Sequence, residues 1–206
     1  AGMGVGSAVP VFEALGGGLL GTPLLSTTLA GQLIWRAAGE SAAEWLGRLC
    51  SGSVGTIAYL DHADWGAANL GVTLGTDGAL MGSKSFVADA GVADCFAVVA
   101  SDGGEPVLAL VERSAMNDSA FSENVLIDLT KRAANVDLTG VIPAQVFRGD
   151  AVAAALRDTL LIGALLTAAE TTGAASKCLK SITEGLPTRK QFGGRGGWDG
   201  ALGQPG

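Results

Sequence analysis

The feature that most limits the fold is a long helical pattern in the last third of the chain. From Asp150, a suitable N-cap, an Ala- and Leu-rich stretch continues for about 33 residues, roughly 50 Å of helix, until Pro187 is expected to end it. One stripe of this helix carries residues, several of them small, that would let another helix approach: Leu156, Leu160, Gly163, Leu166, Glu170 and Gly173. We expect the chain to leave this stripe uncovered, which predicts an oligomer formed through the C-terminal helices.

The residues before this helix change from helical to strand-like spacing. Apolar side chains recur at helical intervals over residues 9–19, and two further helices are expected over 26–38 and 41–49, the latter with a capping box formed by Ser41 and Glu44. Short apolar runs separated by turn sequences then predict strands over 54–60, 70–74, 86–88, 95–100, 107–111 and 125–127. The expected fold class is α+β: helices, then an antiparallel β-domain resembling a sandwich or barrel, then a long helix of an incomplete helical bundle.

These changes in pattern divide the chain into four expected segments. Residues 1–53 are assigned to part of an N-terminal helical domain and residues 54–148 to a middle β-domain. Residues 149–193 are assigned to the first helix of a C-terminal helical domain. Residues 194–206 form a glycine-rich tail that is expected to be flexible.

Composition excludes several classes of function. The 206 residues include 13 Lys and Arg against 20 Asp and Glu, and a net charge of −7 predicts repulsion of nucleic acid and anionic lipid. The longest uncharged helical run, residues 159–169, is too short to span a bilayer. Three distant cysteines and a single histidine argue against a disulfide scaffold or a metal site and favour a cytoplasmic location. Residues 177–195, by contrast, carry five basic side chains against Glu184, which fits either a solvated face or a seat for a phosphorylated small molecule.

Two short motifs are interpreted as structural. Residues 16–21 match the G-x-G-x-x-G pattern of dinucleotide-binding loops, but a helical segment precedes them where a strand is required. Residues 61–64 read Asp-His-Ala-Asp, yet the sequence holds no second histidine and no G-x-S-x-G nucleophile motif to complete a metal or hydrolase site.

Four further segments occur together in one order and resemble the acyl-CoA dehydrogenase family of flavoproteins. The middle β-domain of that family reads G-x-K-x-(W/F)-(I/V)-(T/S)-x-(A/G), followed by an A-D-x-(F/L) strand start, and its C-terminal domain carries R-x-Q-F-G. The matching residues of this chain are 12–16 (FEALG), 80–91 (LMGSKSFVADAG) with 93–100 (ADCFAVVA), 128–138, and 188–193 (TRKQFG). The resemblance covers residues 9–193.

The resemblance implies a bound FAD and names residues that would hold it. Phe86 would pack against the isoalloxazine ring, with Val87 beside it, while Ala88 stands where the family usually has Thr or Ser and would offer only its backbone. Leu60 and Asp61 end the strand that precedes the family's T-E-P-x-G-S-D turn, although the turn itself departs from that pattern. Arg189, Gln191 and Phe192 resemble residues that reach across a dimer interface to the partner's pyrophosphate and adenine.

No catalytic base is identifiable from the resemblance. Family members remove the α-proton of an acyl thioester with a glutamate, which lies either far beyond R-x-Q-F-G or on the first long C-terminal helix. The second position falls near Gly163, and Asp158 and Glu170 flank it by more than one helical turn. A base must lie within hydrogen-bond reach of the proton that it removes.

Two functions within the family and one outside it remain open at this point. The first is an FAD-dependent acyl-CoA dehydrogenase of fatty acid or steroid degradation, present as a truncated chain that is inactive alone. The second is a catalytically silent structural subunit of a heteromeric acyl-CoA dehydrogenase, and the third is an unrelated α+β binding protein. The family resemblance further implies an acyl-CoA thioester as substrate, a homo- or hetero-oligomer, and electron-transfer flavoprotein or another electron acceptor.

Overall fold

The structure is a computed structural model that describes residues 4–61, 71–185, 190–191 and 194–195. The chain forms two compact units, here called the β unit (Gly21–Gly163) and the helical unit (Ala1–Leu20 with Ala164–Gly206). The α-helices are α1 (Val9–Gly18), α2 (Leu24–Ala38), α3 (Ala43–Cys50) and α4 (Ala151–Gly185). The strands are β1 (Gly55–Ala58), β2 (Thr73–Leu74), β3 (Leu80–Met81), β4 (Ser83–Ala88), β5 (Cys95–Asp102), β6 (Glu105–Glu112), β7 (Phe121–Glu123), β8 (Ala133–Asp137), β9 (Gln145–Phe147), β10 (Lys190–Gln191) and β11 (Gly194–Arg195).

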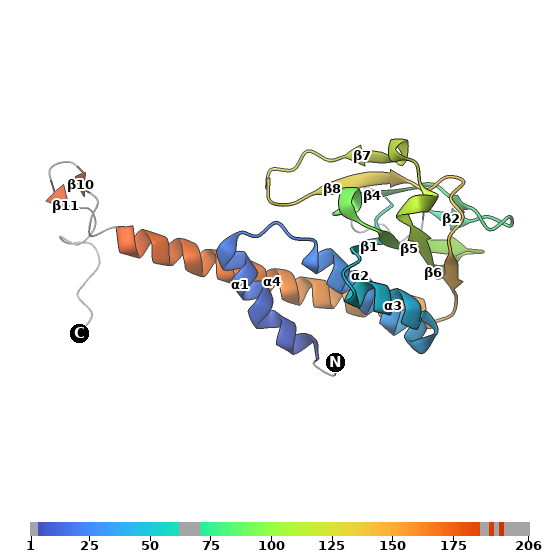
Figure 1. The fold of residues 1–206 in the computed structure, drawn as a ribbon, viewed down its shortest axis with the longest axis horizontal. Helices are drawn as coiled ribbons and strands as arrows, with labels where there is room; N and C mark the ends of the chain where they lie inside the picture. The colour runs from blue at the N-terminus through green and yellow to red at the C-terminus, as the bar shows by residue number, and fades with distance from the viewer. Residues whose placement is uncertain (1–3, 62–70, 186–189, 192–193, 196–206) are drawn as a thin grey trace. The chain divides into compact units, whose positions relative to one another are not determined.

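Two sheets build the β unit. The larger has the order β3-β2-β5-β6-β9, with β1 also paired to β5, and the smaller has the order β4-β8-β7. Most pairs are antiparallel, as predicted, but β1 and β2 both run parallel to β5. Figure 1 shows the two sheets lying one over the other, so the prediction of a sandwich-like β-domain is confirmed.

Strand β5 is buried on both faces, which explains its unbroken apolar sequence. Phe96, Val98 and Ala100 face the smaller sheet, where they pack in one core with Val87 and Val136. The alternate residues of β5 face the helices and pack in a second core with side chains of α2, α3 and the start of α4: Cys95, Ala97 and Val99. Because successive side chains of a strand point to opposite faces, β5 contributes to both cores.

Residues 21–53, assigned by sequence to a helical domain, pack in the same unit as the sheets.

Within the helical unit, α1 and α4 cross at two glycines. A Cβ atom placed on Gly173 would lie 1.8 Å from the backbone oxygen of Glu13, and one on Gly16 would lie 1.8 Å from the backbone oxygen of Glu170. Each helix thus presents a glycine to the backbone of the other. Gly16 opens the G-x-G-x-x-G match, and its structural role is to admit α4, in agreement with the structural interpretation of that motif.

The stripe predicted on the long helix is packed inside this chain. A Cβ atom placed on Gly163 would lie 3.2 Å from the Leu29 side chain of α2. Leu156 and Leu160 join the core below the larger sheet, and Leu166 is fully buried. The expectation that this stripe would be left uncovered is therefore wrong. The apolar side chains that α4 exposes lie at other positions: Leu161, Leu165, Leu179 and Ile182.

Other sequence predictions need correction. Residues 125–127 form no strand, since Val125 and Ile127 are fully exposed between β7 and β8. The predicted capping box is also wrong, because Ser41 lies in a 3-10 helix (Gly39–Ala42) and its hydroxyl donates to the Ala38 carbonyl, while α3 begins without a side-chain cap. Helix α4 is, among the described residues, long enough and apolar enough to cross a membrane, judged by length and composition alone. The 11-residue uncharged run therefore underestimated the length of apolar helix that this segment forms. The first turns of α4 pack in the core of the β unit through Val152 and Ala155.

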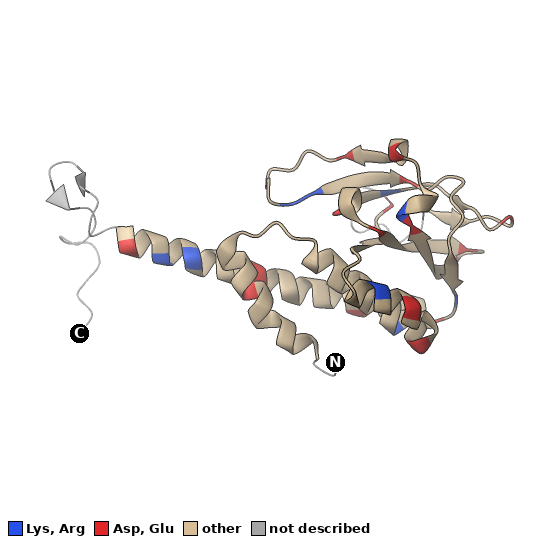
Figure 2. Ribbon diagram, viewed as in Figure 1, with Lys and Arg blue, Asp and Glu red and all other residues tan. Residues whose placement is uncertain are grey.

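Charge along α4 changes toward its C-terminal end. Figure 2 shows basic residues on this part of the helix, where Lys177 and Lys180 are exposed and the Lys180 Nζ lies 3.8 Å from the Glu184 carboxylate one turn later. This arrangement fits a solvated helix face. The rest of the predicted basic segment lies outside the residues whose side chains are described.

Candidate functional site

An irregularity in β4 turns an aromatic side chain outward. In the pairing of β4 with β8 the register shifts between Lys84 and Val87, so the two-residue alternation of the strand is interrupted. Lys84 and Val87 consequently both face the interior, while Phe86 between them is 41% exposed and has a φ of +50°. Its backbone N–H donates to the Asn135 side-chain oxygen at 3.2 Å. A left-handed backbone is rare for an aromatic residue, and it marks a position that the surrounding structure must enforce.

The residue two positions later is fixed through its carbonyl. Ala88 is exposed at the end of β4, and its backbone oxygen accepts a hydrogen bond of 2.6 Å from the hydroxyl of Thr56 in β1. Thr56 is fully buried, so this contact ties the exposed edge of the smaller sheet to the interior of the larger one. Val87, between these exposed residues, is in the core, and any contact it makes to a ligand would come from its backbone.

A polar cluster follows directly after Ala88. Asp89 has a φ of +54°, its carboxylate accepts from the Ser26 hydroxyl of α2, and its side chain is 13% exposed. The Arg132 guanidinium donates to the same carboxylate through Nε at 3.2 Å and through Nη2 at 3.1 Å. The Asp89 N–H in turn donates to the Arg132 carbonyl at 3.0 Å. Three separate segments of the β unit therefore meet at one carboxylate.

Behind β4 lies a buried ion pair between Asp61 and Lys84. The Lys84 side chain is fully buried, and its Nζ lies 2.6 Å from Asp61 Oδ1 and 3.3 Å from the Tyr59 carbonyl. Asp61 is 5% exposed and also accepts from the Val72 N–H at 3.0 Å. Burial lowers the pKa of Lys84, and the hydrogen bond and charge of Asp61 oppose that shift. The Asp61 carboxylate is thus occupied by protein groups, whereas its predicted role toward a cofactor stays a prediction.

The predicted binding residues fall into three groups in the structure. Phe86 and Ala88 share the exposed edge of β4, while Leu60 and Val87 are buried and Asp61 has a side chain that is only 5% exposed. Leu60 supports that edge, because its carbonyl accepts from the Ser85 N–H at 2.7 Å. Arg189 and Phe192 lie outside the described residues, and Gln191 is described only as backbone in β10.

Sequence reasoning missed the cluster around Asp89 and the structural role of Lys84. The available signal for Lys84 was its place in the G-x-K motif, three residues before Val87. It could not reveal a buried partner, because Asp61 is 23 residues away and reaches Lys84 only through the fold.

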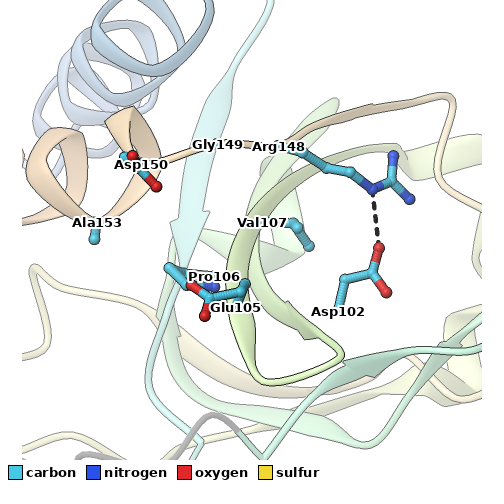
Figure 3. A pocket seen from close by; sticks show the side chains of 8 residues that line it. All are labelled: Asp102, Glu105, Pro106, Val107, Arg148, Gly149, Asp150 and Ala153. Carbon is cyan, nitrogen blue, oxygen red and sulfur yellow. Dashed lines mark hydrogen bonds and ion pairs between the residues drawn. The ribbon is translucent and has the colours of Figure 1, made fainter.

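A separate cavity of about 560 Å³ lies where the β5–β6 hairpin faces the start of α4 (Figure 3). Figure 3 shows the Arg148 side chain pointing to Asp102, to which its Nε donates at 2.9 Å. Glu105 and Asp150 also line the cavity. Since three carboxylates and only one guanidinium, which is already paired, line this cavity, it is unsuited to an anionic thioester of coenzyme A.

Comparison with known proteins identifies the fold. Neither a protein-family model nor a curated protein sequence matches the chain. Among solved structures, butyryl-CoA dehydrogenase from Megasphaera elsdenii is 22% identical with a TM-score of 0.78, and a steroid acyl-CoA dehydrogenase, Tcur3481-Tcur3483, is 27% identical with a TM-score of 0.73. The chain has the acyl-CoA dehydrogenase fold. The resemblance found in the sequence is confirmed by these structures, which match over 94% and 92% of the chain.

The match covers only part of these acyl-CoA dehydrogenases. The chain spans 56% of the butyryl-CoA dehydrogenase and 52% of the steroid acyl-CoA dehydrogenase. PigA, solved with FAD and proline, is also similar, with 20% identity, a TM-score of 0.79, and coverage of 95% of this chain and 56% of PigA.

The described residues fit one part of an FAD molecule. The exposed ring of Phe86 and the neighbouring backbone at Ala88 provide an apolar face and an edge suited to a flat heteroaromatic ring. The residues predicted to meet the pyrophosphate and adenine are 189, 191 and 192, whose side chains are not described. Among the described residues, no group of three or more His, Cys, Asp and Glu side chains is placed to hold a metal ion.

Proposed function

We propose that this chain is an FAD-binding protein of the acyl-CoA dehydrogenase type, which acts in the α,β-dehydrogenation of an acyl-CoA thioester. The observation that carries the proposal is Phe86, an exposed aromatic residue turned outward in a left-handed conformation by the register shift in β4. A left-handed backbone costs a non-glycine residue about 1–3 kcal/mol, and such strained residues cluster at active sites and ligand-binding sites. The similarity of the fold to butyryl-CoA dehydrogenase and to PigA with FAD supports a flavin as that ligand.

In this proposal the residues of the chain bind and orient the ring system. Phe86 packs against one face of the isoalloxazine, and the backbone at Ala88 meets its edge. Ala88 supplies no hydroxyl, so binding is weaker than in relatives with Thr or Ser at this position. The bound flavin would accept the hydride that leaves the β-carbon of the thioester while a base takes the α-proton. Arg189, Gln191 and Phe192 are proposed to bind the pyrophosphate and adenine of a partner's FAD.

Replacement of Phe86 by alanine tests the proposed ring contact. We expect the Kd for FAD to rise about 10-fold, because a stacked aromatic pair contributes about 0.5–1.5 kcal/mol beyond area burial. Titration followed by quenching of flavin fluorescence measures the effect. Trp35→Ala is the matched control, since Trp35 is an exposed aromatic on α2, and it should leave the Kd unchanged. An unmodified chain that binds no FAD would refute the proposed function.

A second prediction concerns the reaction. We expect that the FAD-loaded chain alone will not be bleached rapidly by acyl-CoA thioesters under anaerobic conditions. Gly163 supplies no carboxylate, and Asp158 pairs with Arg36 at 3.5 Å; lack of a positioned base commonly lowers rates by about 10²–10⁴-fold. The flavin absorbance near 450 nm is followed with short, long and bulky thioesters. Rapid bleaching would show that the chain holds a base, and Asp61, Asp158 and Glu170 would then be replaced first.

The second candidate function is a catalytically silent subunit of a heteromeric acyl-CoA dehydrogenase. Ala88 in place of a hydroxyl residue and glycine at position 163 favour it. The steroid acyl-CoA dehydrogenase similar to this chain carries a two-part name, Tcur3481-Tcur3483, which supports a paired assembly.

For both candidate functions we propose a homo- or hetero-oligomer in the cytoplasm and a role in lipid degradation. The proposed electron acceptor is electron-transfer flavoprotein or another acceptor. Bleaching that appears only when a second, base-carrying chain is added would favour the silent subunit.

A further inference from the structure

The turn that follows the exposed edge of β4 is held by one side chain. Asp89 comes directly after Ala88, three residues after Phe86, and is itself in a left-handed conformation. The strand therefore leaves its exposed edge through a backbone geometry that aspartate tolerates better than most residues.

The Asp89 carboxylate joins three parts of the β unit. It accepts from Ser26, which is 4% exposed on α2, and from two nitrogens of Arg132, just before β8. The backbone N–H of Asp89 closes the cluster by donating to the Arg132 carbonyl. Hydrogen bonds to an ionised group are about twice as strong as neutral ones. Because the carboxylate is only 13% exposed, its bonds are less screened than those of a surface ion pair.

The cluster acts together with Thr56 on the same short segment. Thr56 holds the Ala88 carbonyl from β1, Asn135 holds the Phe86 N–H from β8, and Asp89 fixes the next residue against α2. Within the described part of the chain, neither Phe86 nor Ala88 belongs to a buried apolar core that would keep it in place by packing. The polar contacts therefore act in addition to the pairing of β4 with β8 and the burial of Val87, and among these contacts only those of Asp89 include charged groups.

We infer that Asp89 is a positioning residue for flavin binding. Its carboxylate, anchored by Ser26 and Arg132, fixes the turn after Ala88 and so fixes the places of the Phe86 ring and the Ala88 backbone. The inference rests on the proposed function. It assigns to Asp89 an indirect contribution, with no contact to the flavin itself.

Two variants and two measurements test the inference. Asp89→Ala removes the carboxylate, while Asp89→Asn keeps its size and the tolerance for a left-handed backbone but removes the charge. We expect the Kd for FAD to rise about 10-fold in Asp89→Ala and about 3-fold in Asp89→Asn, with a change in the visible circular dichroism of the bound flavin. In the FAD-free protein, hydrogen exchange of residues 84–90 should be faster in Asp89→Ala.

A matched control separates this effect from a general loss of stability. Asp102→Asn removes a carboxylate that also pairs with an arginine, at 2.9 Å, on the β5–β6 hairpin, and it should change neither the Kd nor the dichroism. If Asp89→Ala does not fold, Ser26→Ala, which removes one donor to the same carboxylate, is measured in its place.

The possible failures are distinguishable. If the unmodified chain binds FAD and the Asp89 variants bind it with the same Kd and the same dichroism, the inference is wrong and the proposed function stands. A lower Tm with unchanged flavin binding would likewise reduce Asp89 to a structural role. If the unmodified chain binds no FAD, the proposed function fails and the inference fails with it, whatever the exchange of residues 84–90 shows.

Discussion

Asp61→Asn is expected to lower the free energy of unfolding by about 3–5 kcal/mol, the usual effect of removing one partner from a buried ion pair. The substitution leaves the Lys84 ammonium fully buried without a charged partner, because only neutral acceptors remain beside it: the new amide oxygen and the Tyr59 carbonyl at 3.3 Å. Burial already lowers the pKa of Lys84 with Asp61 present. Urea unfolding followed by tryptophan fluorescence measures the difference between the two proteins.

The double variant Asp61→Asn with Lys84→Met should recover most of the lost stability. It removes both charges, and asparagine can still accept from the Val72 N–H. The exposed pair offers the control, since Asp102→Asn should cost at most about 1 kcal/mol. Equal, small losses for Asp61→Asn and Asp102→Asn would mean that the buried pair contributes no more than a surface one.

The pair also gives a pH dependence with a definite sign. A lowered pKa means that folded Lys84 binds its proton less tightly than unfolded Lys84 does, so the unfolded state carries more protons between the two pKa values. The contribution of Lys84 to stability is therefore complete above its unfolded pKa and is lost as pH falls through its folded pKa. The double variant should lack this rise on the alkaline side.

Gly173→Ala is expected to separate α1 from α4. The new methyl group would lie 1.8 Å from the Glu13 backbone oxygen, a distance that no side-chain rotation can relieve. Overpacking of this kind commonly costs about 1–3 kcal/mol, and a clash with backbone is harder to absorb than one with a side chain. We expect the amide protons of residues 9–18 to lose their protection from hydrogen exchange.

Gly17→Ala is the matched control for this prediction. Gly17 lies next to Gly16 on the same helix, but its Cβ would meet the Gly173 oxygen at 3.6 Å, an ordinary contact. Alanine is also the better helix former, so this variant should keep or slightly raise stability. If Gly173→Ala keeps full protection over residues 9–18, as Gly17→Ala should, Gly173 does not govern the crossing of the helices.

The alternation of residue types determined much of this architecture directly from the sequence. The Ala- and Leu-rich pattern after Asp150 predicted α4, because its small and apolar residues recur every three to four positions, and its stripe did receive other helices. Apolar runs predicted β5 and β6 at nearly their observed bounds; they also placed strands at β1, β2 and β4, but the runs over 54–60 and 70–74 are longer than β1 and β2, and the run over 86–88 is only the second half of β4. Four segments in one order, over 12–16, 80–100, 128–138 and 188–193, together indicated the family resemblance. These features are local, so a short window of sequence contains the physical information that specifies them.

Only the tertiary structure decided how the candidate site is assembled. The register shift that turns Phe86 outward depends on how β4 pairs with β8, and the spacing of β4 alone would place Phe86 on the same face as Lys84. The partners of Lys84 and Asp89 lie 23 to 63 residues away along the chain. Whether the stripe on α4 is exposed or covered was likewise decided by α1 and α2, which lie far from α4 in the sequence and pack against it. Such contacts join segments that no local pattern connects, because their energy arises only after the strands and helices have packed together.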